Sequence, residues 1–302
     1  MSIKVLIIGY GSIGKRHAGI LNEMDKISDV TVLSSQSNLP FKTIKSTEEI
    51  PGLDPDYLVV ASNTALHHEQ LVFVDNNLQG RKILMEKPLF DVFHDLEIRN
   101  NQVFVGYNLR FHPLIQLIKE KITNKKLWNI QIFCGSYLPS WRPGRDYQET
   151  SSAKKETGGG VLLDLSHELD YVQWLTGKID IINTVNEKVS DLEIDTDDIL
   201  ILSGKSESGA YVHITLNYFT RKPIRQFIID GEGISIHADL IANLLFISEQ
   251  GKTSEFSWPE LSRNETYKAQ HNAIINDDIT YLCTFKEGLE TMRLIDNIKS
   301  FN

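Results

Sequence analysis

Two kinds of hydrophobic pattern follow one another along the chain. Up to about residue 106, short continuous apolar runs alternate with helical segments. Such runs are typical of strands buried on both faces, and strands that alternate with helices form a parallel sheet. Strands are expected at Lys4–Gly9, Val30–Ser34, Tyr57–Ala61, Lys82–Met85 and Gln102–Gly106. Helices are expected at Lys15–Met24, Leu66–Asn76 and Phe90–Asn100, with a short one starting at a capping box, Ser46–Glu49.

From Leu127 onward the pattern changes to alternation of apolar and polar residues. Trp128, Ile130, Ile132 and Cys134 alternate with polar neighbours, as expected for a strand with one face in water. Further strands are expected at Ile199–Lys205, Ala210–Phe219, Phe227–Asp230, Ile234–Ala238 and Leu244–Ser248, before a last helix at Thr284–Ser300. The sequence therefore predicts an α/β Rossmann-type domain at residues 1–107. An α+β domain with a mixed or antiparallel sheet follows at 108–302, and its final helix is expected to pack back on the first domain.

Composition narrows the class of protein. The 302 residues suit two domains, and 31 Lys+Arg against 40 Asp+Glu give a formal net charge of -9. This acidic balance argues against nucleic-acid and membrane partners, and the Lys119–Lys126 basic patch is only local. Cys134 and Cys283 lack CxxC spacing, so neither a disulfide framework nor a metal site is indicated, and a cytoplasmic location is expected.

The first strand-to-helix turn carries a G-x-G-x-x-G motif. Gly9 permits the tight turn, Gly11 allows close approach of a pyrophosphate, and Gly14 allows the helix to pack on the strand. The helix start, with Ser12 and Ile13, would supply amide donors and the positive end of the dipole. The alternative is a purely structural turn, but the position between a strand and a helix favours dinucleotide binding.

The residues after the second strand leave the choice of cofactor open. Ser34 and Ser35 stand where an acidic residue would bind the ribose hydroxyls of NAD and repel a 2′-phosphate. Both NAD and NADP are therefore possible cofactors.

Two later segments end strands that should approach the nicotinamide. Ser62, Asn63, Thr64 and His67 follow the third strand, where Thr64 can cap the next helix and a lone His is more often structural than catalytic. Glu86-Lys87-Pro88 follows the fourth strand, and a charged pair there is costly unless the site uses it.

These motifs resemble the glucose–fructose oxidoreductase/inositol dehydrogenase/rhizopine catabolism (Gfo/Idh/MocA) family. The resemblance rests on residues 9–17, Thr64–His67, Glu86–Pro88, Tyr107–Pro113 and the Gly158–Asp164 segment. It implies a large, open, mostly antiparallel sheet in the second domain, and homodimers or homotetramers formed through that sheet.

The segment after the triple glycine is expected to be a helix with two faces. Asp164, His167, Glu168 and Tyr171 would lie opposite Leu162, Leu165, Leu169 and Val172. The polar face could simply meet water, but the resemblance favours Asp164 and His167 facing a substrate cleft. Asp164 precedes His167 by three residues rather than the family's four, so His167 is the better candidate. Asp170 could orient His167 or pair with a cation.

A third set of residues is a candidate for sugar recognition. Trp141, Arg142 and Arg145 combine an aromatic surface with guanidinium forks, although a surface loop with salt bridges is equally compatible. This stretch, with residues 164–170, resembles a branch of the family associated with surface-polysaccharide sugars. Tyr107 and Arg110 would shape the floor of the pocket.

The leading hypothesis is an NAD(P)-dependent oxidoreductase acting on a sugar, sugar nucleotide or sugar acid. His167 would serve as the base, Lys87 would stabilise the substrate oxygen or relay its proton, and Asp164 would hold substrate or polarise Lys87. The alternative is a non-catalytic dinucleotide sensor of the same fold, which need not keep both Lys87 and His167.

Overall fold

The computed structural model describes residues 2–301, and the chain divides into two compact units. The first unit contains the residues up to Asn108 together with Arg263–Met292. The second contains Leu109–Ser262 and the residues from Arg293 on. The first unit therefore includes a segment that follows the second sheet in the sequence.

A seven-stranded sheet forms the centre of the first unit, in the order β15-β6-β5-β4-β1-β2-β3. Neighbouring strands run parallel except β15, which is antiparallel to β6. The strands are β1 (Ile3–Ile8), β2 (Ile27–Leu33), β3 (Lys42–Ile44), β4 (Tyr57–Val60), β5 (Lys82–Met85), β6 (Gln102–Val105) and β15 (Cys283–Thr284). The order β3-β2-β1-β4-β5-β6 is that of dinucleotide-binding domains, which confirms the predicted Rossmann-type sheet.

One predicted helix of the first unit is wrong. The helices of this unit are α1 (Ser12–Asn22), α2 (Ile50–Leu53), α3 (His67–Asn77), α7 (Arg263–Ile275) and the start of α8 (Phe285–Lys299). The segment expected as a helix at Phe90–Asn100 is irregular instead. The Asp75 carboxylate accepts hydrogen bonds from the backbone amides of Arg99 and Asn100, at 3.0 and 3.2 Å. These amides are thus satisfied without a helical partner.

The second unit is built on an eight-stranded sheet in the order β14-β13-β12-β11-β7-β10-β9-β8. Only β7 and β10 pair in parallel, so the mixed, mostly antiparallel sheet is confirmed. The strands are β7 (Leu127–Gly135), β8 (Ile179–Glu187), β9 (Ile199–Ser206), β10 (Tyr211–Asn217), β11 (Ile224–Gly231), β12 (Ile234–Asp239), β13 (Leu244–Glu249) and β14 (Lys252–Ser257).

At the start of β7, a β-bulge interrupts the expected alternation of buried and exposed residues. Ile130, Ile132 and Cys134 are buried as expected, but Trp128 is 54% exposed. The pairing with β11 shifts register at this point, so that Leu127 takes the inward position.

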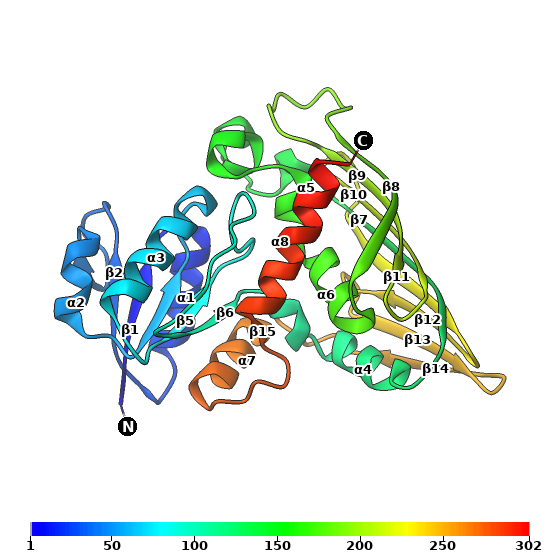
Figure 1. Ribbon diagram of the computed structural model, residues 1–302, viewed down its shortest axis with the longest axis horizontal. Coiled ribbons are helices and arrows are strands. Elements are labelled where there is room, and N and C mark those ends of the chain that lie inside the picture. Colours follow the sequence, from blue (N-terminus) through cyan, green and yellow to red (C-terminus); the bar gives the residue numbers. More distant parts are fainter. Residues whose placement is uncertain (1, 302) are drawn as a thin grey trace. The chain divides into compact units, whose positions relative to one another are not determined.

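The two faces of this sheet differ. Helices α4 (Pro113–Ile122), α5 (Val161–Asp164) and α6 (His167–Thr176) lie on one face (Figure 1). The other face carries exposed apolar side chains from β7, β9, β10 and β11, namely Phe133, Ile201, Tyr211 and Ile228. Exposed apolar side chains gathered on one sheet face are typical of an interaction surface.

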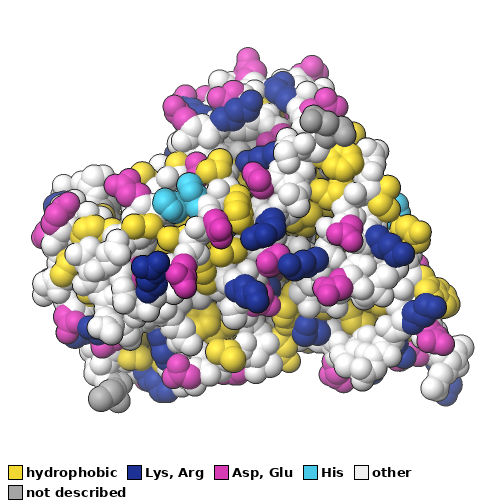
Figure 2. Space-filling model, in the orientation of Figure 1, with side chains coloured by type: hydrophobic (Ala, Val, Ile, Leu, Met, Phe, Trp, Pro, Cys, Tyr) yellow, Lys and Arg dark blue, Asp and Glu magenta, His cyan; other side chains and the backbone are white. Residues whose placement is uncertain are grey.

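Surface charges of both signs are interspersed. On the face drawn in Figure 2, Lys and Arg side chains alternate with Asp and Glu, without a broad basic block. Charges of both signs are thus present on this face, in a chain with a formal net charge of -9. Within residues 2–301, no helix combines the length and the hydropathy needed to cross a membrane.

Candidate active site

The carboxyl ends of β1 and β4 meet at a turn that only glycine fits. Gly9 has φ +96°, and a Cβ at this position would lie 2.7 Å from the backbone of Ser62. A Cβ on Gly14 would lie 2.1 Å from the Gly9 carbonyl oxygen, whereas a Cβ on Gly11 would meet nothing within 4 Å. Gly9 and Gly14 are therefore required by packing, and Gly11 leaves open space beside the backbone.

The amino-terminal end of α1 keeps its donors available. Its N-cap, Gly11, provides no side-chain cap, and the first amide bonded along this turn is that of Lys15, to the Gly11 carbonyl at 2.9 Å. The amides of Ser12, Ile13 and Gly14 thus stand at the positive end of the helix. Open space at Gly11 and uncapped amides are the features that a pyrophosphate requires, so these residues fit a dinucleotide.

A lysine that the sequence analysis did not single out reaches the end of β2. Lys45 Nζ donates to the carbonyls of Ser34 and Gln36, at 3.0 and 2.6 Å. Ser34 is buried and accepts from the Gln36 amide, whereas Ser35 is exposed. The loop thus carries a positive charge and no carboxylate, which is compatible with either NAD or NADP.

In the segment after β4, Thr64 does not have the helix-capping position expected from the sequence. Thr64 lies inside a 3₁₀ turn, Thr64–Leu66, rather than capping a helix, and Ser62 Oγ donates to Gln70 Oε1 at 2.6 Å. Asn63 is exposed before this turn. His67 begins α3 and is 1% exposed. His67 is thus an internal residue, and its predicted contact with the cofactor stays a prediction.

His67 holds the loop that follows Lys87. Its Nδ1 lies 3.1 Å from the Pro88 carbonyl oxygen and 3.2 Å from that of Leu89, so this nitrogen donates. Burial lowers the pKa of His67 below its ordinary value, which keeps the imidazole neutral. The residue thus fixes the backbone just beyond Lys87.

Glu86 and Lys87 follow β5 directly. Glu86 is 6% exposed, and its Oε1 lies 2.8 Å from His17 Nε2 while its Oε2 accepts the Lys87 amide at 3.1 Å. Gly106 makes room for this carboxylate, because a Cβ there would lie 2.9 Å from Oε1. Lys87 itself is half-buried at the carboxyl edge of the sheet, where ligands of such folds bind.

In the second unit, the triple glycine leads into an aspartate-capped turn. Gly160 has φ +114°, and a Cβ there would lie 2.3 Å from Asp197 Oδ1. Asp197 Oδ2 accepts the Leu162 amide at 2.9 Å, and the Asp197 carbonyl accepts that of Val161. Asp197 thus fixes the start of α5, a role that the sequence pattern did not reveal.

The single helix expected after the glycines is interrupted. α5 ends at Asp164 and α6 begins at His167, because Leu165 leaves helical geometry with φ -101° and ψ 27°. Glu168 is fully buried, with an Arg225 nitrogen 2.6 Å from its carboxylate, and Tyr171 is 1% exposed. Of the four residues expected on the polar face, Glu168 and Tyr171 are therefore internal, and Asp164 and His167 are half-buried.

Tyr218 holds Asp164 in place. Its hydroxyl, just beyond the end of β10, donates to Asp164 Oδ2 at 2.6 Å. Burial, together with the neighbouring Asp164 carboxylate, raises the pKa of Tyr218 well above its ordinary value, so the hydroxyl keeps its proton. The Trp141 ring packs edge-on against Tyr218, with centroids 5.2 Å apart. The structure thus connects two predicted site residues, Trp141 and Asp164, through a tyrosine that the sequence analysis missed.

The Trp141–Arg145 segment lines a shallow pocket with Leu138, Tyr147 and Thr150. Trp141 Nε1 donates to Ser136 Oγ at 2.8 Å, which orients the indole. Arg142 is half-buried and Arg145 is exposed. Among residues 2–301 neither guanidinium forms an ion pair, so the salt-bridged surface loop is not what the structure shows.

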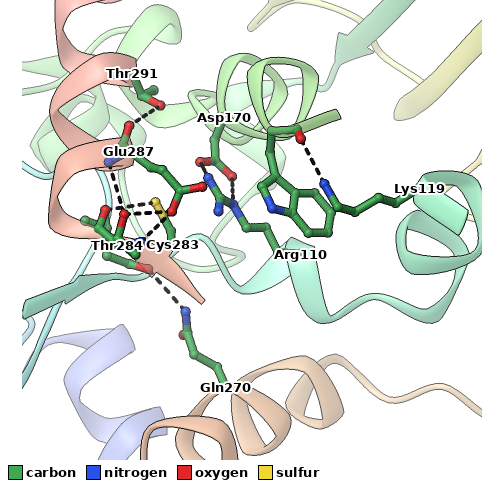
Figure 3. A network of polar contacts seen from close by, with 10 residues as sticks. Arg110, Lys119, Asp170, Gln270, Cys283, Thr284, Glu287 and Thr291 are labelled. Carbon is green, nitrogen blue, oxygen red and sulfur yellow. Dashed lines mark hydrogen bonds and ion pairs between the residues drawn. The ribbon is translucent and has the colours of Figure 1, made fainter. Parts of the chain in front are cut away.

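Arg110 and Tyr107 belong to the interior. Arg110 is 2% exposed, and its Nε and Nη2 donate to the two Asp170 oxygens, at 3.0 and 2.7 Å. Figure 3 shows the two groups facing each other, with Lys119 donating to the Trp174 carbonyl beside them. Tyr107 is fully buried. The role of both residues in the floor of the pocket stays a prediction, and Asp170 pairs with a cation, Arg110, which was one of the two roles considered for it.

We expect the stability of the protein to fall on mild acidification. Burial lowers the pKa of His67, His112 and His271 below the ordinary value. In the unfolded chain these histidines take up a proton near pH 6.5, whereas in the folded chain they do so only at a lower pH. The stabilisation is thus complete above that pH and is lost as the pH falls through the lower folded-state values, at up to about 1.4 kcal/mol per histidine per pH unit. Urea unfolding between pH 7.5 and 5.5 measures the slope. His112→Gln should reduce it, and an unchanged slope in this variant would contradict the assignment.

Two family models match the chain. One, an oxidoreductase family with an NAD-binding Rossmann fold, covers residues 3–106, and the other, the Gfo/Idh/MocA C-terminal domain, covers residues 115–237. No curated protein matched the sequence. The matched residues contain the glycine cradle, Lys87, Asp164 and His167.

Several solved structures share the fold over nearly the whole chain. The WlbA dehydrogenase from Bordetella pertussis, in complex with NADH and UDP-GlcNAcA, is 18% identical with a TM-score of 0.78, covering 99% of this chain and 96% of that one. UDP-N-acetylglucosamine 3-dehydrogenase GnnA from Acidithiobacillus ferrooxidans is 17% identical with a TM-score of 0.79, covering 99% and 97%. Levoglucosan dehydrogenase, with NADH and levoglucosan, is 16% identical with a TM-score of 0.85, covering 99% and 96%. The chain therefore belongs to the Gfo/Idh/MocA family of NAD-binding oxidoreductases.

Proposed function

We propose that the protein transfers a hydride between a nicotinamide dinucleotide and a carbinol or keto carbon of a sugar derivative. One observation carries the proposal. The carboxyl ends of β1, β4 and β5 belong to neighbouring parallel strands, and they bear the glycine cradle, Ser62 and the anchored Glu86-Lys87 pair. Such an edge combines a place for the phosphates with a cation for a substrate oxygen.

Each unit supplies its own part of the chemistry. The nicotinamide, when bound, takes up or returns the hydride. In the oxidative direction His167 of the second unit is the base that removes the proton from the substrate hydroxyl. Lys87 of the first unit supplies a positive charge that stabilises alkoxide character on a substrate oxygen. Asp164, held by the Tyr218 hydroxyl at 2.6 Å, accepts from another substrate hydroxyl. In the reductive direction the proton returns from His167 to the oxygen.

We propose a negatively charged sugar as substrate, either a sugar nucleotide or a sugar acid. The support comes from Arg142 and Arg145, whose guanidinium groups make no ion pairs within residues 2–301 and which line the same shallow pocket as Trp141. An arginine fork suits a phosphate or carboxylate, and the indole suits a sugar or base. The WlbA structure is a complex with UDP-GlcNAcA, and GnnA is a UDP-N-acetylglucosamine 3-dehydrogenase, which favours a UDP-linked sugar. A role in surface-polysaccharide sugar metabolism is part of the proposal.

The proposal extends to assembly and location. The sheet face that bears Phe133, Ile201, Tyr211 and Ile228 would bury these side chains against a second copy, in a homodimer or homotetramer. Both cysteines are buried and neither is in a disulfide, which suits a reducing cytoplasm.

The test is a turnover assay followed at 340 nm. Purified protein is incubated with NAD⁺ or NADP⁺ and each of UDP-N-acetylglucosamine, its uronic acid, glucose and levoglucosan, with Lys87→Met as the inactive control. We expect reduced nicotinamide with a UDP-linked sugar and much less with the neutral sugars. Cofactor binding without turnover in either direction on any of these sugars would instead support the non-catalytic sensor.

A further inference from the structure

A buried chain of polar side chains ends at the loop that carries Lys87. Tyr57 Oη lies 2.8 Å from His271 Nδ1, and His271 Nε2 lies 2.8 Å from His17 Nδ1. His17 Nε2 lies 2.8 Å from Glu86 Oε1, and the other Glu86 oxygen accepts the Lys87 amide. Three of these side chains are at most 1% exposed, and Glu86 is 6% exposed. None of them has a part in the proposed hydride transfer.

With a neutral His17, the Glu86 carboxylate at one end sets the direction of the other hydrogen bonds. A carboxylate only accepts, so His17 donates from Nε2 to Glu86 and a neutral His17 accepts at Nδ1. His271 then donates from Nε2 and accepts at Nδ1, and Tyr57 donates its hydroxyl proton. Burial, with His17 beside it, holds the pKa of His271 well below its ordinary value, which agrees with a neutral ring. In this arrangement both histidines carry their proton on Nε2.

The chain joins elements that are far apart in the sequence. Tyr57 lies on β4, His17 on α1 and His271 on α7, all within the first unit. Gln270, next to His271, adds a hydrogen bond to the Val105 carbonyl at 3.3 Å, at the strand end beside Gly106. The Glu86 carboxylate is thus confined between His17, the space left by Gly106 and the Lys87 amide.

We propose that Tyr57, His271 and His17 are positioning residues, which orient Glu86 and through its carboxylate fix the peptide that carries Lys87. The proposal rests on the catalytic role proposed for Lys87. A lysine at the end of a strand is flexible along its own side chain, so its accuracy depends on a fixed backbone. Each link in the chain depends on the next, because a reversed histidine tautomer would place a lone pair against the Glu86 oxygen.

Amide exchange in the protein without ligands tests the structural part. Pro88 has no amide, so the Lys87 amide can be followed as the last exchanging position of its segment. His17→Leu removes the donor to Glu86 and should accelerate exchange of the Lys87 amide about tenfold, whereas His17→Gln keeps both a donor and an acceptor and should restore the slow rate. Tyr57→Phe should act in the same direction, by about threefold. Long-range ¹⁵N–¹H spectra of the imidazoles should show Nε2-protonated tautomers for His17 and His271.

Kinetics test the catalytic part. With the UDP-linked sugar that the wild type oxidises, His17→Leu should lower kcat about 30-fold with an unchanged KM for the dinucleotide, and His17→Gln should recover most of kcat. Asp75→Ala is the control, because it removes a buried carboxylate at the far end of α3 and should change neither the Lys87 amide nor kcat.

The possible outcomes separate the two proposals. The positioning role would be overturned if the β1 amides exchanged faster by the same factor as the Lys87 amide. It would also be overturned if His17→Leu and His17→Gln accelerated exchange of the Lys87 amide equally. The same holds if Lys87 exchange responds as expected but kcat does not change. A wild-type protein that oxidises no sugar would instead count against the proposed function, while the exchange and tautomer results would still decide whether the chain fixes the Lys87 peptide.

Discussion

Lys87→Met lowers kcat by about 10³-fold, with dinucleotide affinity changed less than threefold. The substitution keeps the length and apolar stem of the side chain and removes only the ammonium group. Lys87 is half-buried next to Glu86, so its charge acts where water is partly excluded. An interaction that strengthens as the substrate oxygen gains charge contributes to kcat rather than to binding of the ground state. Steady-state kinetics on the UDP-linked sugar, with dinucleotide binding followed by fluorescence, measure both quantities.

The control for this variant is Lys126→Met. Lys126 is exposed and precedes β7, so its charge is solvated and should leave kcat unchanged. A Lys87→Met enzyme with normal kcat and a well-folded spectrum would remove Lys87 from the mechanism.

Asp170→Ala is expected to destabilise the second unit by about 3–5 kcal/mol. Arg110 and Asp170 are each 2% exposed at the side chain, and the pair is bidentate. Removing the carboxylate takes the Asp170 charge away from a buried guanidinium, whose carbon lies 5.2 Å from the centre of the Trp174 ring. Urea unfolding followed by fluorescence measures the loss.

Two comparisons separate burial from charge in this prediction. Asp54→Ala breaks the exposed pair with Arg81, whose aspartate is 64% exposed, and should cost at most about 1 kcal/mol. The double change Arg110→Leu with Asp170→Leu removes both charges and should recover much of the stability. If Asp170→Ala instead kept full stability and raised only the KM for sugar, Arg110 would be a substrate contact after all.

Local patterns along the sequence were enough for five strands of the first sheet, but not for the short β3 and β15. Those five strands are continuous apolar runs, and the Ser46–Glu49 capping box forms as expected. The pattern misled at Phe90–Asn100, because the partner of that segment is Asp75 on α3 rather than its own backbone. It also misled after the triple glycine. There, spacing alone cannot reveal that Leu165 breaks the helix and turns Glu168 and Tyr171 inward.

In the candidate site too, local motifs predicted some residues, whereas contacts between distant segments could not be predicted. Motifs identified the glycine cradle, Lys87, Asp164 and His167, because these residues stand at fixed offsets within one turn or loop. The residues that hold them in place come from distant segments: Tyr218 for Asp164, and His271 for the chain that ends at Glu86. No local spacing relates such pairs. The pairing of Arg110 with Asp170, which lies 60 residues away, could not be read from local spacing either.

Transfer of deuterium from the sugar to the dinucleotide tests the central claim most directly. The protein is incubated with oxidised dinucleotide and UDP-N-acetylglucosamine, or its uronic acid, carrying deuterium on the ring carbons, and the reduced dinucleotide is analysed by mass spectrometry. Direct hydride transfer predicts one deuterium in each reduced nicotinamide formed, at a rate that Lys87→Met lowers about 10³-fold. Reduced dinucleotide without deuterium, or no reduction although the dinucleotide binds, would contradict the account.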